Sequence, residues 1–201
     1  MLLGMSAAAI RRPTVGTLAG GANGLTCSEI VARDRYGIDL VRPSDTFEGA
    51  LSQLRLGKVD QVLVPAAYPL VRNWIMATDL RVIDTFIAPI VPLVLASPDL
   101  ITPDPARVAF FHPATESILA TLGIEILERV PCESNPEAAR RASVLEEAVA
   151  ITNLPSAEAY GLHVLTVLRP SLHMPWLLFR LAEPRLDEER PTHTFEPTPS
   201  T

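Results

Sequence analysis

Two segments indicate the fold class: Thr14-Val15-Gly16-Thr17-Leu18 and, after a glycine-rich turn, Thr26-Cys27-Ser28-Glu29. The first segment is rich in β-branched and apolar residues, which predicts a strand. In the second, a threonine stands three residues before a glutamate, the signature of a capping box at the start of a helix. A strand that leads through a short turn into a helix is the building unit of an α/β fold.

The same alternation continues along the chain. Further helix starts are marked by Asp45-Thr46-Phe47-Glu48, by His112-Pro113 and by Ser134-Asn135-Pro136-Glu137. Short apolar runs predict strands at 61–64, 81–87, 91–96, 108–111, 125–130, 149–152, 164–168 and 177–180. We therefore expect an α/β protein with largely parallel sheets.

Composition excludes several classes of function. The chain has 201 residues, of which 48% are hydrophobic, and a net charge of −6, so no basic stripe is available to neutralise the phosphates of a nucleic acid. The spacing of Cys27 and Cys132 matches no zinc or redox motif, and no metal site is expected. No P-loop, GxGxxG, HExxH or GxSxG motif occurs, and no cofactor is expected.

The two ends of the chain differ from the rest. The apolar residues 1–10 precede Arg11 and Arg12, which is the wrong order for a signal peptide, and they are too few to span a membrane. We expect a cytoplasmic protein without a membrane partner. Residues 1–12 are interpreted as a disordered leader and residues 183–201 as a disordered tail, because the tail is rich in proline and poor in apolar residues.

Helix starts that follow strands predict a site for a small anion. Each offers unpaired backbone N–H groups and a partial positive charge, which suits a carboxylate. For three side chains the sequence allows two interpretations each. Tyr68 faces the cleft or packs in the core, His112 acts on a ligand or caps a helix, and Arg169 clamps a carboxylate or forms a surface ion pair. The helix start should lower the pKa of Cys27, but the sequence shows no partner that makes it a nucleophile.

Several segments, read in order, resemble the catalytic domain of prephenate dehydratase. They are Val15-Gly16-Thr17-Leu18, Leu25 to Glu29, Ser44 to Glu48, Gly57-Lys58-Val59-Asp60, Val64-Pro65, Phe111-His112-Pro113, Ser134 to Ala139 and Ala159 to Leu162. Two departures bear on the reaction. Ala66-Ala67-Tyr68 stands where the dehydratases have Glu-Asn-Ser, and Met174-Pro175-Trp176 where they have Thr-Arg-Phe.

These departures are shared with a second group, the bacilysin-type prephenate decarboxylases. The sequence is similar to them in Ala67-Tyr68, in Phe111-His112-Pro113, and in the spacing of Arg-Pro-x-x-x-Met-x-Trp from Arg169 to Trp176. The resemblance implies non-aromatising decarboxylation of prephenate in antibiotic or other secondary metabolism. Prephenate dehydration in phenylalanine biosynthesis and a non-catalytic small-anion-binding module remain the alternatives, and a homodimer is left open.

The resemblance also implies a fold and a site. The fold is two-lobed, of the type 2 periplasmic-binding-protein kind, with lobe 1 at 13–88 plus 160–182, lobe 2 at 89–159 and the ligand cleft between them. The chain should cross between the lobes near 88–92 and near 157–160. The candidate proton donors are Tyr68, His112 and His173. The candidate substrate-binding residues are Thr17, Thr26, Cys27, Ser28, Ala67, Ser134, Asn135, Thr152, Asn153, Arg169, Met174 and Trp176.

Overall fold

The computed structural model describes residues 11–19 and 24–183, so most of the expected leader and tail lies outside the described residues. The elements, in chain order, are β1 (Val15–Leu18), α1 (Cys27–Tyr36), η2 (Ile38–Leu40), β2 (Val41–Ser44), α2 (Phe47–Arg55), β3 (Gln61–Pro65), α3 (Val71–Ile75), β4 (Leu80–Ile90), β5 (Leu93–Ser97), β6 (Ala106–Phe111), η3 (Pro113–Thr115), α4 (Glu116–Leu119), β7 (Ile126–Pro131), α5 (Asn135–Ala142), β8 (Ala148–Asn153), α6 (Leu154–Ala159), β9 (His163–Arg169) and β10 (Leu172–Leu181).

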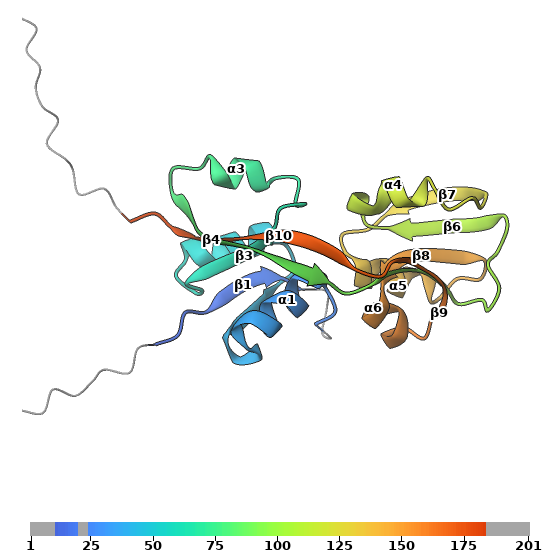
Figure 1. Cartoon of the computed structure of the whole chain (residues 1–201), viewed down its shortest axis with the longest axis horizontal. Coiled ribbons are helices and arrows are strands. Elements are labelled where there is room, and N and C mark those ends of the chain that lie inside the picture. Colours follow the sequence, from blue (N-terminus) through green and yellow to red (C-terminus); the bar gives the residue numbers. More distant parts are fainter. Residues whose placement is uncertain (1–10, 20–23, 184–201) are drawn as a thin grey trace, which may run out of the picture.

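Two five-stranded sheets form two lobes, seen side by side in Figure 1. The first sheet has the order β2-β1-β3-β10-β4, and the second has the order β7-β6-β8-β5-β9. In each sheet three strands run parallel and the remaining two are antiparallel to their neighbours. The expectation of largely parallel sheets was thus only partly right, because the antiparallel strands belong to the connections between the lobes.

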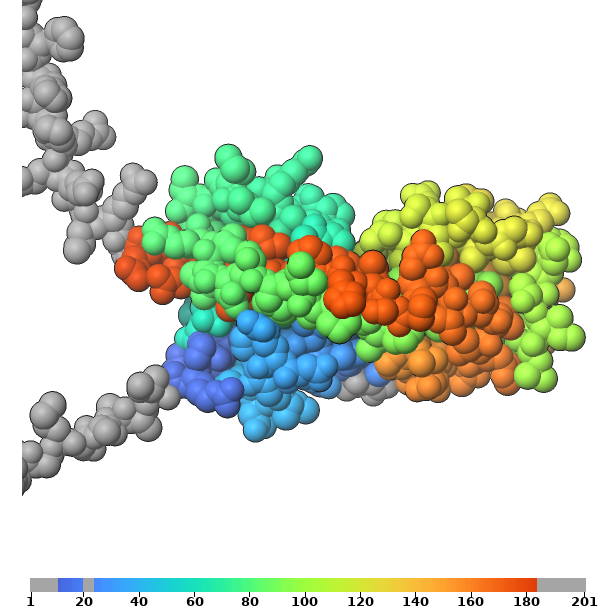
Figure 2. Space-filling model, in the orientation of Figure 1, coloured from blue at the N-terminus to red at the C-terminus, as the bar shows by residue number. Residues whose placement is uncertain are grey.

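The chain crosses between the lobes twice. The first crossing lies between Ile90 and Leu93, and the second between Arg169 and Leu172. Ile90 pairs with Leu172 in the first sheet and Leu93 with Arg169 in the second, so the two crossings run side by side. In the space-filling view of Figure 2, the atoms of β4 (green) and β10 (orange-red) run along the surface toward the second lobe.

The second crossing differs from the expected one. We expected residues 160–182 to belong to the first lobe, but β9 pairs with β5 and extends the second sheet. The strand pattern at 164–168 predicted a strand, and the sequence alone did not say which sheet it joins. A strand's partner depends on contacts between distant residues, whereas its existence depends on local pattern.

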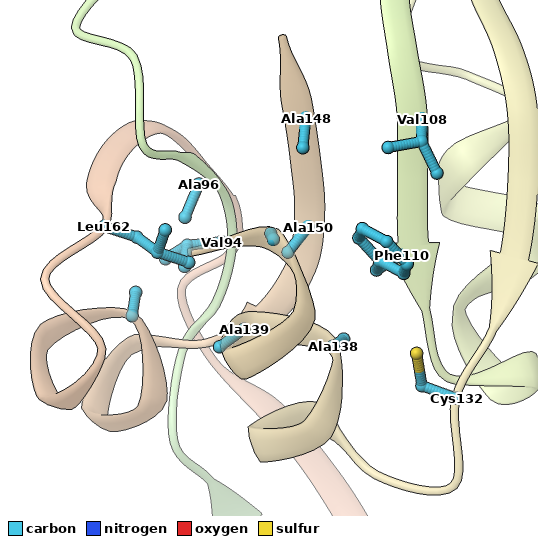
Figure 3. Close-up of a cluster of buried hydrophobic side chains, with 12 residues drawn as sticks. Val94, Ala96, Val108, Phe110, Cys132, Ala138, Ala139, Ala148, Ala150 and Leu162 are labelled. Carbon is cyan, nitrogen blue, oxygen red and sulfur yellow. The ribbon is translucent and has the colours of Figure 1, made fainter. Parts of the chain in front are cut away.

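Each lobe has a core of its own. In the first, the aromatic side chains of Phe47, Trp74 and Phe179 pack with Leu54 and Val62. In the second, alanines of α5 and β8 let the helix approach the sheet closely, and Phe110 and Cys132 fill the space beside them (Figure 3). Among the described residues, no helix is long and apolar enough to cross a membrane.

The helix starts follow the capping signals of the sequence. The side-chain oxygen of Thr26 accepts the backbone N–H of Glu29, and that of Ser134 accepts the N–H of Glu137. The second helix begins one residue later than its signature suggested, because Thr46 and not the preceding aspartate accepts the N–H of Gly49. These caps fix where α1, α2 and α5 begin, and therefore which backbone N–H groups point beyond the strands.

Candidate functional site

A cavity of about 200 Å³ lies between the two lobes. The first lobe contributes the start of α1, the segment after β3 and the inward face of β10. The second contributes the η3 turn and the start of α5. Its wall contains Leu18, Thr26, Cys27, Ser28, Phe47, Pro65, Ala67, Tyr68, Pro69, Ile90, Leu93, His112, Ala114, Thr115, Ile118, Glu133, Ser134, Asn135, Leu172, Met174 and Trp176.

The start of α1 forms one polar part of the wall. Thr26 is buried and makes two hydrogen bonds with one hydroxyl: it accepts the N–H of Glu29 at 3.1 Å and donates to the carbonyl of Leu18 at 2.7 Å. The second bond ties the helix start to the end of β1. Thr26, Cys27 and Ser28 therefore lie where the sequence predicted, beyond the first strand and at the cavity.

The start of α5 faces the cavity from the other lobe, and contacts join it to α1. The side-chain amide of Asn135 donates to the sulfur of Cys27 at 3.7 Å. Asn153 donates to the carbonyl of Leu25 at 2.7 Å and lies 3.9 Å from the same sulfur. These hydrogen bonds link residues more than a hundred positions apart and hold the two lobes together at the cavity.

Burial changes the chemistry of Cys27. Burial raises the pKa of the Cys27 thiol, and the hydrogen bonds from Asn153 and Asn135 oppose that rise in part. The expectation that the helix start lowers this pKa was wrong, because desolvation disfavours the thiolate more than the nearby donors stabilise it. The thiol is protonated at neutral pH.

Tyr68 has both of the roles that the sequence left open. Its ring packs between Phe47 and Trp74, at centroid distances of 4.7 and 5.7 Å, and also lines the cavity. Its hydroxyl donates to the carboxylate of Glu48. Burial, together with that carboxylate, raises the pKa of Tyr68, so the phenol holds its proton.

His112 is both a helix cap and a cavity residue. Its Nδ1 accepts the backbone N–H of Ala114 at 3.2 Å, so the neutral ring carries its proton on Nε2. Burial lowers the pKa of His112, and the charge of Glu133 opposes this. At neutral pH the imidazole is a hydrogen-bond donor through Nε2.

Strand alternation separates the residues of the C-terminal motif. Met174 and Trp176 are on the cavity face of β10, while His173 is exposed on the opposite face. Arg169 is exposed at the end of β9, donates to the carbonyl of Leu168 and is not among the residues of the cavity wall. The structure therefore brings together two of these four residues.

Three further candidates lie outside the cavity wall. Thr17 is fully buried and donates to the carbonyl of Leu63 at 2.9 Å. Thr152 donates to the backbone carbonyl of Asn135 at 2.8 Å, and Asn153 caps α6 by accepting the N–H of Ser156. Thr152 and Asn153 contact the lining residues Asn135 and Cys27, and none of the three candidates lines the cavity itself.

Sequence reasoning missed two acidic residues and the apolar wall. Glu133 lines the cavity, and Glu48 and Glu133 both line a wider hollow that adjoins the cavity and shares Tyr68 and His112 with it. The capping box contained Glu48 but gave no sign of its tyrosine partner. Within the described part of the chain, no three His, Cys, Asp or Glu side chains are grouped as metal ligands.

The comparisons with known proteins concern the fold. No protein-family model matches the sequence, and neither does any curated protein. Among solved structures, prephenate dehydratase from Arthrobacter aurescens, in complex with L-Phe, matches with a TM-score of 0.62 at 21% identity, over 85% of this chain and 61% of that one. The chain has the fold of a prephenate dehydratase.

Two other structures match the same fold. Prephenate dehydratase from Staphylococcus aureus matches with a TM-score of 0.57 at 15% identity, over 83% of this chain and 67% of that one. A quorum-quenching acylase, GqqA, matches with a TM-score of 0.53 at 18% identity, over 86% and 66%. The expected two-lobed α/β fold is thus confirmed. The chain spans about three fifths of the length of the Arthrobacter enzyme.

Proposed function

We propose that the chain binds prephenate in the interlobe cavity and removes its ring carboxylate as CO₂ without making the ring aromatic. The resemblance of the Arg169 to Trp176 segment to the bacilysin-type decarboxylases supports a role in antibiotic or non-proteinogenic amino-acid biosynthesis. Two residues of that segment, Met174 and Trp176, line the cavity.

One observation carries the proposal: the cavity combines two helix starts with a largely apolar wall, and its described lining contains no lysine or arginine. The helix starts at Thr26 and Ser134 suit the pyruvyl carboxylate. A second carboxylate placed against Leu172, Met174 and Ile118 finds no cation to stabilise it. Decarboxylation removes that negative charge from the apolar region, so the apolar surroundings favour the reaction.

The hydroxyl of prephenate decides between the two reactions. Loss of this hydroxyl together with CO₂ would make the ring aromatic, and it requires an acid that protonates the leaving oxygen. His112 offers the N–H of a neutral ring, and the hydroxyl of Tyr68 donates its hydrogen bond to the carboxylate of Glu48. Neither group is placed as a strong acid at neutral pH, which supports retention of the hydroxyl.

The test is incubation of the purified chain with prephenate, followed by mass and ultraviolet spectra of the product. We expect a product that has lost CO₂ alone and lacks the absorbance of an aromatic ring. Phenylpyruvate as the main product would identify a dehydratase and refute the proposal.

A second candidate is a non-catalytic module that binds a small anion. The positions of Arg169 and His173, both outside the cavity wall, favour it because two of the residues implied in substrate binding and proton transfer do not reach a ligand there. Titration calorimetry separates the two: binding of prephenate with no change of the ligand during hours of incubation would support the module.

A further inference from the structure

Decarboxylation of prephenate needs a proton for a ring carbon, and the three expected donors are poorly suited to supply it. Cleavage of the carbon–carboxylate bond pushes an electron pair into the diene, which must take up one proton. His173 is on the outward face of β10. The Tyr68 O–H is engaged by the carboxylate of Glu48. His112 lines the cavity, but its neutral ring holds only the Nε2 proton, and a neutral imidazole is a much weaker acid than a thiol.

Cys27 lines the cavity and carries an acidic proton that these residues lack. It is the first residue of the ten-residue helix α1. Its sulfur accepts hydrogen bonds from the amides of Asn135 and Asn153, which leaves the S–H proton free to point elsewhere. The same amides and the helix start would stabilise a thiolate once the proton has left.

An independent observation points to a ligand in the same cavity. Trp176 lines it and is 1% exposed, and its indole N–H has no hydrogen-bond partner among the described residues. A buried donor without an acceptor costs about 1–3 kcal/mol. A ligand in the cavity that carries carboxylate or hydroxyl oxygens supplies the kind of acceptor that this donor lacks.

We infer that Cys27 is the proton donor of the proposed decarboxylation, an inference that rests on the proposed function. The bond between the ring and its carboxylate breaks and CO₂ leaves. The electron pair moves through the diene, and a ring carbon takes the proton of the Cys27 S–H. The thiolate that remains accepts the two amide hydrogen bonds and regains a proton from water after the product leaves. No oxidant, reductant or metal takes part.

The experiment compares the whole chain with Cys27→Ser and Cys27→Ala in D₂O with prephenate. For the unaltered chain we expect CO₂ release and one solvent-derived deuterium on a single face of the ring. The variants should lose about a hundredfold or more in kcat, the usual contribution of a general acid. Their KM should change by less than about threefold, because the proton is transferred in the transition state and not on binding.

Cys132→Ser is the matched control, because Cys132 is the other cysteine and packs in the core of the second lobe. It should keep both the rate and the single-face deuterium. Thermal melts establish that each variant is folded. If both Cys27 variants fail to fold, iodoacetamide is applied to the folded Cys132→Ser chain. The inference would be supported if alkylation abolishes CO₂ release and if prephenate present during alkylation prevents that loss. Unchanged release after complete alkylation would overturn it.

The possible failures can be told apart. If the unaltered chain decarboxylates prephenate and the folded Cys27→Ser variant does so at a similar rate and on the same face, only the proton-donor role is overturned. If the unaltered chain releases no CO₂, the proposed function fails and this role fails with it.

Discussion

Replacing Thr26 by alanine tests how much one hydroxyl at the start of α1 contributes to the free energy of unfolding. That oxygen caps the helix and also binds the carbonyl of Leu18, and the side chain is 3% exposed. Loss of an N-cap costs about 0.5–2 kcal/mol. Loss of the second hydrogen bond in a buried place adds about 1 kcal/mol. The free energy of unfolding should therefore fall by about 1.5–3 kcal/mol.

Thr46→Ala provides a matched comparison, because Thr46 caps α2 with the same side chain but is exposed and makes only the cap bond, at 2.9 Å. It should cost about 0.5–1 kcal/mol. Urea unfolding measures both variants, and Thr26→Ser should recover most of the loss. Equal costs for Thr26→Ala and Thr46→Ala would refute the reasoning, since burial and the Leu18 bond would then contribute nothing.

Two further predictions concern His112 and Arg169. Burial holds the pKa of His112 below its unfolded value of about 6.5, so the unfolded chain takes up the proton first and stability is lost as the pH falls below about 6.5. In His112→Asn the new side chain can still cap the helix but does not titrate. Between about pH 7.5 and about pH 5, the melting temperature of this variant should therefore fall less than that of the unaltered chain. An equal fall would show that other groups set the acid sensitivity. Arg169→Ala should change the KM for prephenate by less than about twofold, because Arg169 is exposed outside the cavity wall. A rise in KM of about tenfold or more would show that Arg169 binds a carboxylate of the substrate.

Features that depend on neighbours along the chain were predictable from the amino-acid sequence. The helix starts at Thr26 and Ser134 were predictable because a cap joins residues three positions apart. Most strands were predictable because their apolar character is local. The ordered family motifs added the two-lobed architecture, which the solved structures confirm. The same motifs identified most of the polar residues of the cavity wall.

Which of these elements meet depends on contacts that form only in the folded chain. The sequence of β10 does not say that Met174 faces the cavity and His173 faces outward, because strand alternation gives two faces without saying which is covered. It does not say that β9 joins the second sheet and carries Arg169 away from the cavity. The interaction of Cys27 with Asn135 spans 108 positions and forms only when both lobes are folded and closed against each other. That closure buries the thiol, and desolvation then reverses the pKa shift that the local helix start alone would have produced.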